Sequence, residues 1–197
     1  MAEIAAKPLK VTGVPGISAR QLAEHYTLYV GYVNKLEEIR EALREAGLSM
    51  ANQTYSALRA AKAAEPFALN GVKLHELYFE NLGGTGGRPS GRLLEMIERD
   101  WGSFEAWEAQ FKACGVAARG WVVLAYDPLD GRLQNFSMDA HDVGAIWGAV
   151  PLLVMDTYEH AYVIDYGVKR PPYIEAFMKN IDWDVVNRRW KEVLGNS

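Results

Sequence analysis

An aspartate and a histidine stand four residues apart in the last third of this chain, and together they can bind a metal ion. Asp156 follows a short apolar run, 150–155, that is typical of a buried strand, and His160 comes four residues later. Because residues at this spacing lie on one side of a helical turn, both side chains can converge on one point. An anionic oxygen with a neutral imidazole suits manganese, iron or zinc.

The bulk composition is that of an ordinary soluble protein. The chain has 197 residues, of which 49% are apolar and 23% charged, enough for one good core or two small ones. The net charge of −4 and the lack of any Lys/Arg run argue against a nucleic-acid partner. No apolar stretch approaches the roughly 20 residues of a membrane span, so no membrane partner is expected.

The single cysteine, Cys114, excludes a disulfide within the chain. The first residues also lack the apolar core that a secretory signal peptide needs. We therefore expect a cytoplasmic protein.

The first half is expected to be helical. Ser18 can cap a helix over 19–46, whose apolar residues recur at helical spacing. A short helix is predicted over 52–64, followed by a second long helix over 67–82. That second helix bears His75 among apolar neighbours, where a lone histidine is ordinarily structural.

The second half combines helices with a small sheet. A glycine-dense linker, 83–90, is followed by helices over 91–101 and 104–117. Three strand-like runs follow, at 120–126, 132–137 and 150–155. Helices then resume from Tyr158 and include 173–180 and 183–193. An Asp-Gly turn at 130–131 suits a hairpin, so the first two strands should be antiparallel.

These elements predict an α+β fold built of two domains. Residues 1–86 form an N-terminal long-helix hairpin domain. Residues 87–197 form a C-terminal α/β domain with a small three-stranded antiparallel sheet. The metal site is expected between the two domains.

Several longer motifs surround the Asp156–His160 pair. They include Pro-Leu-Leu-Val-Met-Asp-Thr-Tyr-Glu-His-Ala-Tyr at 151–162, Arg-Pro at 170–171 and Asp-Trp-Asp-Val-Val-Asn at 182–187. Earlier matches include Pro-Ser-Gly-Arg-Leu-Leu at 89–94 and Gly-Trp-Val at 120–122. Together they resemble the iron/manganese superoxide dismutase family. The resemblance implies a superoxide dismutase, an enzyme that disproportionates superoxide to dioxygen and hydrogen peroxide.

The resemblance also implies one iron or manganese ion per subunit, held by three histidines and one aspartate. It assigns Asp156, His160 and His75 as ligands. The first ligand depends on the alignment, because this segment is one residue shorter than the family pattern. Aligning forward from 17–18 selects His25, whereas aligning backward from 32–34 selects Glu24. We favour His25 and keep Glu24 as the alternative.

Two further residues are implied as catalytic. Tyr32 resembles the gateway tyrosine beside the substrate channel, and His141 resembles the residue that hydrogen-bonds to the solvent ligand and tunes the metal potential. Trp121 and Tyr158 would wall the site. Tyr158 replaces a tryptophan common in the family, and Tyr29 stands where a gapless alignment expects a channel histidine.

The resemblance implies a homodimer, with Glu159 and Tyr162 at the interface. Two other hypotheses remain open. The same ligands also suit zinc, which has no redox chemistry. Alternatively, the protein is a non-catalytic relative whose altered first helix has spoiled the metal site. Iron and manganese cannot be told apart from ligands that the two metals share.

Overall fold

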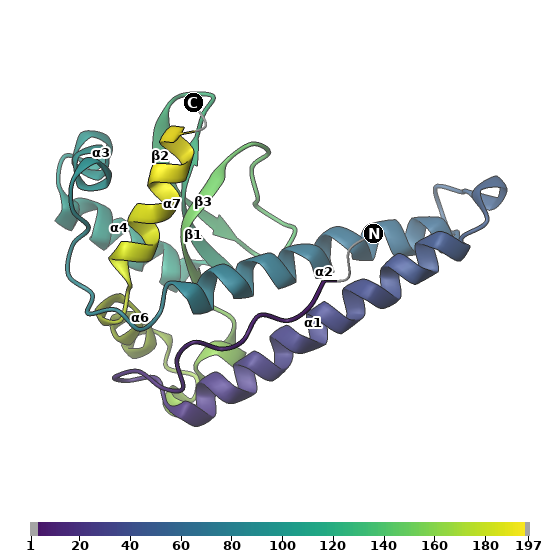
Figure 1. Cartoon of the computed structure of the whole chain (residues 1–197), viewed down its shortest axis with the longest axis horizontal. Helices are drawn as coiled ribbons and strands as arrows, with labels where there is room; N and C mark the ends of the chain where they lie inside the picture. Colours follow the sequence, from purple (N-terminus) through teal and green to yellow (C-terminus); the bar gives the residue numbers. More distant parts are fainter. Residues whose placement is uncertain (1–3, 196–197) are drawn as a thin grey trace.

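Two long helices lie side by side in the computed structural model, which describes residues 4–195 (Figure 1). Helix α1 spans Ala19–Glu45, and helix α2 spans Ala57–Glu80. As expected, Ser18 caps α1, because its side-chain oxygen accepts the backbone N–H of Gln21. The pair forms the helical hairpin that the sequence predicts.

The prediction of two separate helices over 52–64 and 67–82 is wrong. Helix α2 runs unbroken through Pro66, although proline removes one helical hydrogen bond. Packing along α1 outweighs that local cost and keeps the helix continuous. The helix also begins later than predicted. The side chain of Asn52 accepts the N–H of Thr54 and forms a turn, in a connection that also holds the 3₁₀ helix η1, Leu48–Met50.

The second half contains the predicted three-stranded antiparallel sheet. Its strands are β1, Trp121–Asp127; β2, Arg132–Met138; and β3, Val150–Asp156. Their order is β2-β1-β3, so β1 is central and pairs antiparallel with both neighbours. In this register Trp121 stands opposite Asp156, which places an indole beside the carboxylate at the end of β3.

The described part of the second half also contains six further helices, of which those over 92–101, 104–117 and 183–195 contact the sheet. They are α3, Arg92–Trp101; α4, Phe104–Ala117; the 3₁₀ helix η2, Glu159–Ala161; α5, Val163–Tyr166; α6, Arg170–Lys179; and α7, Trp183–Gly195. Helix α6 starts three residues earlier than predicted, because a proline suits the first turn of a helix. Among residues 4–195, no helix is long and apolar enough to cross a membrane.

The glycine-rich segment between the halves is bound to the end of α6. The backbone N–H groups of Gly83 and Gly84 both donate to the carbonyl oxygen of Asn180. A Cβ atom on Gly84 would lie 2.2 Å from the carbonyl oxygen of Ile181, so this close approach requires glycine. The predicted domain boundary at residue 86 falls in this segment and stays a prediction.

Candidate metal centre

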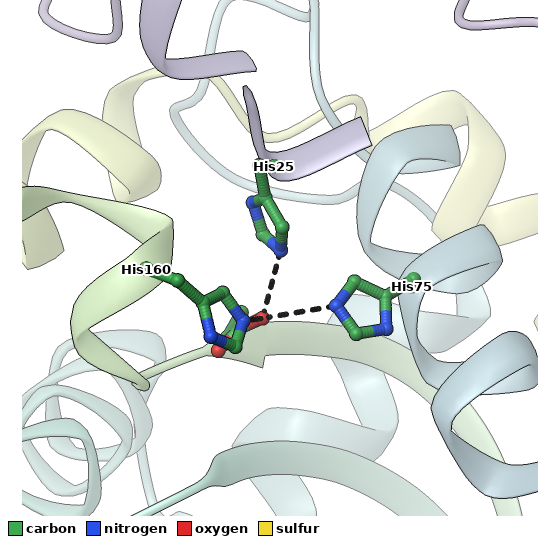
Figure 2. Close-up of side chains that lie close together, drawn as sticks. His25, His75 and His160 are labelled. Carbon is green, nitrogen blue, oxygen red and sulfur yellow. Dashed lines mark hydrogen bonds and ion pairs between the residues drawn. The ribbon is translucent and has the colours of Figure 1, made fainter. Parts of the chain in front are cut away.

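Four side chains from different parts of the chain converge between the halves (Figure 2). They are His25 on α1, His75 on α2, Asp156 at the end of β3 and His160 in η2. Their ligand atoms all lie within 4.8 Å of one another. The structure thus brings together all four residues predicted as metal ligands.

The carboxylate of Asp156 lies at the centre of the group. Its Oδ2 atom is 3.0 Å from Nε2 of His25 and 3.1 Å from Nε2 of His160. Nε2 of His75 is 3.7 Å from the same oxygen. The side chains of His25, His75 and Asp156 are fully buried, whereas that of His160 is 27% exposed. His160 is therefore the cluster residue nearest to the surface of the protomer.

The geometry of α1 selects His25, and not Glu24, as the residue of this helix that belongs to the cluster. His25 is fully buried in the cluster, whereas Glu24 is exposed to solvent. Helix α1 is regular from end to end, and residues seven apart in a regular helix share a face. His25 and Tyr32 therefore both point into the site, although the segment between them is one residue shorter than the family pattern.

The backbone of α2 fixes the proton on His75. Its Nδ1 atom lies 2.6 Å from the carbonyl oxygen of Gly71, which can only accept, so Nδ1 carries the hydrogen. Nε2 is then an acceptor that faces Asp156, and it is buried without a hydrogen-bond partner in the described part of the chain. A bare, buried imidazole nitrogen that faces a carboxylate fits a metal ligand.

The electrostatics keep two of the imidazoles neutral. Burial lowers the pKa of His25, and burial together with the neighbouring His25 lowers the pKa of His75 to about 3. Burial alone would raise the pKa of Asp156, but the charge and hydrogen bond of His160 outweigh burial and lower it. His25 and His75 are therefore neutral beside a carboxylate. Against the effect of burial, the charge and hydrogen bond of Asp156 raise the pKa of His160, so this ring would give up its proton when a metal binds.

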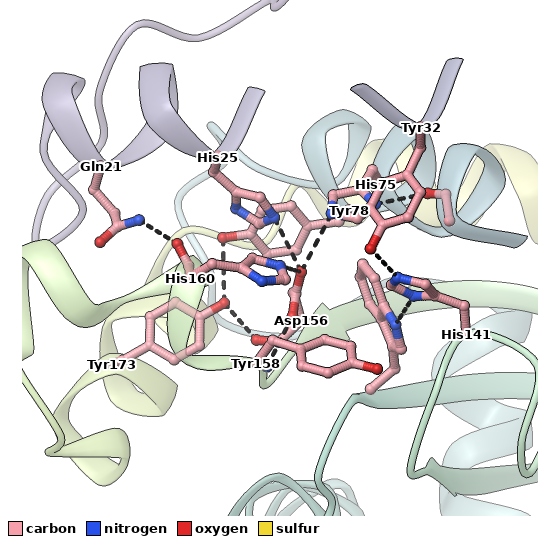
Figure 3. Close-up of polar contacts among 12 residues, drawn as sticks. Gln21, His25, Tyr32, His75, Tyr78, His141, Asp156, Tyr158, His160 and Tyr173 are labelled. Atoms are coloured by element: carbon pink, nitrogen blue, oxygen red, sulfur yellow. Dashed lines mark hydrogen bonds and ion pairs between the residues drawn. The ribbon is translucent and has the colours of Figure 1, made fainter. Parts of the chain in front are cut away.

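A chain of hydrogen bonds runs along one side of the cluster (Figure 3). Nε1 of Trp121 donates to Nδ1 of His141 at 2.9 Å, and Nε2 of His141 lies 2.8 Å from the hydroxyl oxygen of Tyr32. An indole N–H can only donate, so the neutral His141 must carry its proton on Nε2. That proton is donated to Tyr32, which leaves the tyrosine's own proton free to point elsewhere.

Aromatic rings wall the cluster, as expected for Trp121 and Tyr158. The Trp121 ring lies 5.0 Å from that of His75, and the Tyr158 ring stacks on His160 at 5.2 Å. Phe67, which the sequence reasoning missed, packs 4.5 Å from the His141 ring.

Tyr29 occupies the position where the resemblance implies a channel histidine. Its hydroxyl donates to Oε1 of Glu76 at 2.9 Å and accepts the backbone N–H of Lys7 at 2.8 Å. The group is therefore tied to the N-terminal segment. The Tyr29 ring is 6.4 Å from that of His75, so it packs behind this ligand.

Two other residues at the site also escaped prediction. Tyr173 donates its hydroxyl to the backbone carbonyl of Asp156 at 2.7 Å, and Gln21 donates to the backbone carbonyl of His160 at 2.6 Å. Both act on the main chain of a cluster residue from far away in the sequence. No local pattern reveals such contacts.

Comparisons with known proteins agree with this geometry. Residues 89–189 match the family model described as iron/manganese superoxide dismutases, C-terminal domain. The chain is 48% identical to a superoxide dismutase [Fe] of Aquifex aeolicus, over 94% of this chain and 90% of that protein. It is 41% identical to a superoxide dismutase [Mn] of Haloarcula marismortui, over 86% of this chain and 83% of the relative. The chain therefore belongs to the iron/manganese superoxide dismutase family.

Proposed function

We propose that this protein is a superoxide dismutase that converts two superoxide anions and two protons into dioxygen and hydrogen peroxide. The observation that carries the proposal is the convergence of His25, His75, Asp156 and His160 within 4.8 Å. The family membership and the iron and manganese named for its relatives support the same activity.

These four side chains would hold one iron or manganese ion per subunit. A bound ion of either metal supplies reversible one-electron chemistry between its divalent and trivalent states. The anionic Asp156 favours the higher charge, and the carbonyl of Gly71 holds the ring of His75 in place. The first helix is not spoiled by its missing residue, so the non-catalytic alternative is not favoured.

Tyr32 and His141 would handle protons at the site. Because Nε2–H of His141 is donated to the hydroxyl oxygen of Tyr32, the phenol's own proton is free to point toward the cluster. The same hydrogen bond would stabilise the phenolate that remains once this proton has been passed on. The indole of Trp121 holds His141 in the tautomer that this direction requires.

The surrounding aromatic rings would select the substrate by size. Tyr158 and Phe67 stand on the accessible side of the cluster, next to His160 and His141 respectively. Superoxide is a small anion that can pass such rings, whereas larger reductants cannot. An apolar lining also strengthens the attraction between an entering anion and a bound cation.

Removing one ligand tests the metal assignment. We expect His160→Ala to lose bound metal and superoxide-dismutating activity while it keeps the helical signal in circular dichroism. Tyr26→Phe is a control, because the Tyr26 hydroxyl donates its hydrogen bond to the backbone carbonyl of Lys7, which is outside the four-residue cluster. An active, metal-replete His160→Ala protein would contradict the assignment. Elemental analysis would detect zinc, and a protein that holds zinc alone would rule out dismutation.

We further propose that the active form is a homodimer that joins at the mouth of the site. Glu159 is exposed there, and its side chain forms no hydrogen bond or ion pair within the described part of the chain. Next to it, Val163 and Ile164 are 42% and 38% exposed. Tyr162 is 2% exposed and accepts a hydrogen bond from Arg170, so it would support the interface from inside the protomer.

Sedimentation analysis tests the dimer. The wild-type chain should sediment at twice the mass of 22.0 kDa. We expect Glu159→Lys to shift the protein toward the monomer, because the substitution reverses the charge at the proposed interface and places a longer side chain there. Glu65→Lys, the same charge reversal at a residue of α2 whose ion pair is with Lys62 of the same helix, should leave the dimer intact. A monomeric wild-type protein would contradict this proposal without affecting the metal assignment.

A further inference from the structure

The side chain of Gln21 connects α1 to the chain around His160 (Figure 3). Gln21 is fully buried and lies one helical turn before His25 on the same face of α1. Its Nε2 atom donates to the backbone carbonyl oxygen of His160 at 2.6 Å. Its Oε1 atom accepts the backbone N–H of Ile164 at 2.9 Å. The donor and the acceptor of this one amide therefore both form hydrogen bonds with the short segment 160–164.

The two backbone groups that Gln21 contacts are the pair that an α-helix would join directly. In a helix the N–H of each residue bonds to the carbonyl four residues earlier, and Ile164 is four residues after His160. Here the amide of Gln21 stands between the two groups. A side chain that inserts into the ladder in this way interrupts a helix.

The helical structure is broken between His160 and Ile164, the two residues that Gln21 bridges. The 3₁₀ helix η2 ends at Ala161, and α5 begins at Val163. Between them Tyr162 has a φ of −147° and a ψ of −8°, which is not helical. The direction of a side chain follows from its backbone, so a continuous helix through this point would turn the His160 imidazole.

We propose that Gln21 is a positioning residue for His160. By bridging His160 and Ile164, it keeps η2 separate from α5 and so holds the His160 imidazole against Asp156. Because Gln21 and His25 leave α1 on one face, this helix sets the position of two ligands, one directly and one through the main chain. The inference rests on the proposed metal site.

Two substitutions test the two hydrogen bonds of the Gln21 amide. Gln21→Met has a similar length and forms neither hydrogen bond. Gln21→Glu keeps an oxygen for the Ile164 N–H and replaces the amide nitrogen that faces the His160 carbonyl by a second oxygen. The matched control is Asn180→Leu, which removes another buried amide, one that donates to the carbonyls of Pro15 and Ala176.

Three measurements are made on each full-length protein after loading with iron or manganese. They are the electron paramagnetic resonance spectrum, the rate of metal loss to a chelator, and the Tyr162 backbone angles in a crystal structure. We expect both Gln21 variants to show an altered spectrum and a metal-loss rate raised roughly 10-fold or more, as for other residues that orient ligands. In Gln21→Met, Tyr162 should move to a helical φ near −63°.

The control distinguishes positioning from general stability. Asn180→Leu should unfold more easily yet keep the wild-type spectrum and rate of metal loss. Wild-type spectra and rates in both Gln21 variants would overturn the inference, as would a Tyr162 that stays non-helical in Gln21→Met. If Gln21→Met does not fold, Gln21→Glu decides through its spectrum and metal loss. A wild-type protein that takes up neither metal would instead refute the proposed function, while the Tyr162 angles would still test the role of Gln21.

Discussion

At the scale of single residues, the site depends on which atoms hold protons. Trp121 can only donate to His141, and His141 in turn donates to Tyr32. Burial lowers the pKa of His141 and favours the neutral ring that this direction requires. The phenol of Tyr32 is thus the last member of the chain before the cluster, and its proton is the one available there.

Removing this phenol should slow turnover without releasing the metal. We expect Tyr32→Phe to lower the turnover rate about 10-fold or more, since a well-placed proton donor typically contributes at least that much. Metal content should stay at the wild-type value, because Tyr32 is not among the four clustered ligands. Pulse-radiolysis kinetics measure the rate. Wild-type turnover in Tyr32→Phe would assign the proton to another donor.

The residue types at the site could be predicted from the sequence, but not all of their contacts. Asp156 and His160 reveal themselves by spacing, because both lie on one short segment. Gln21 acts on His160 across 139 positions of sequence, and no pattern reports that distance. The choice between His25 and Glu24 also needed the structure, because only a regular α1 places His25 inside and Glu24 outside.

At the scale of elements, the site requires α1 and α2 to approach closely. A Cβ atom on Gly71 would lie 2.9 Å from a ring carbon of Tyr32, so the glycine allows this ring to lie against α2. The carbonyl of the same residue orients His75. Gly71 therefore serves both the helix contact and the ligand.

Opposite effects are expected at two helical glycines. Alanine normally stabilises a helix by up to about 1 kcal/mol relative to glycine. We expect that gain in Gly31→Ala, where nothing lies within 4 Å of the added carbon. Gly71→Ala should instead lose about 1–3 kcal/mol through crowding and weaken the Tyr32–His141 contact. Urea denaturation measures both changes, and equal gains in the two variants would contradict the close contact.

The helices show how far local signals extend. The capping serine of α1 and the Asp-Gly hairpin between β1 and β2 lie where the sequence places them, because both are local effects. The break expected before residue 67 is absent, because contacts with α1 outweigh the cost of Pro66. Packing between segments distant in the sequence therefore determines that α2 continues through Pro66.

At the scale of the whole molecule, Glu80 joins three distant segments. Its carboxylate accepts hydrogen bonds from Lys7 in the N-terminal segment, at 3.2 Å, and from Arg189 in α7, at 3.0 Å. Burial acts to raise the pKa of Glu80, but Arg189 and Lys7 outweigh it, so the pKa lies below the ordinary value of 4.5. The ionised carboxylate of Glu80 is thus more favourable in the folded protein than in the unfolded chain, and it stabilises the fold.

This shift gives a pH dependence of defined sign. A carboxyl with a lowered folded pKa contributes stability above its unfolded pKa and loses it as the pH falls. We expect Glu80→Gln to cost about 1 kcal/mol at pH 7, and the difference from wild type to vanish as the pH drops below 4.5. Urea denaturation of the metal-free proteins at several pH values measures this difference.

Glu65→Gln is the control for this experiment. Its side chain is as exposed as that of Glu80, at 28%, but its partner Lys62 lies on the same helix. Such a local pair contributes only about 0.3–0.5 kcal/mol. A Glu80→Gln penalty that persists unchanged into acid would show that the charge of Glu80 does not link the segments.

The depth of the cluster determines how the protein would acquire its metal. His25, His75 and Asp156 have no contact with solvent, and they come from both halves of the chain. Apart from the side of His160, which is 27% exposed, the ion would be released only when the halves part, which is rarer than surface motion. Whichever ion is at hand while the chain folds would then stay. The iron-to-manganese ratio of a purified batch would record the supply during growth and not an equilibrium preference.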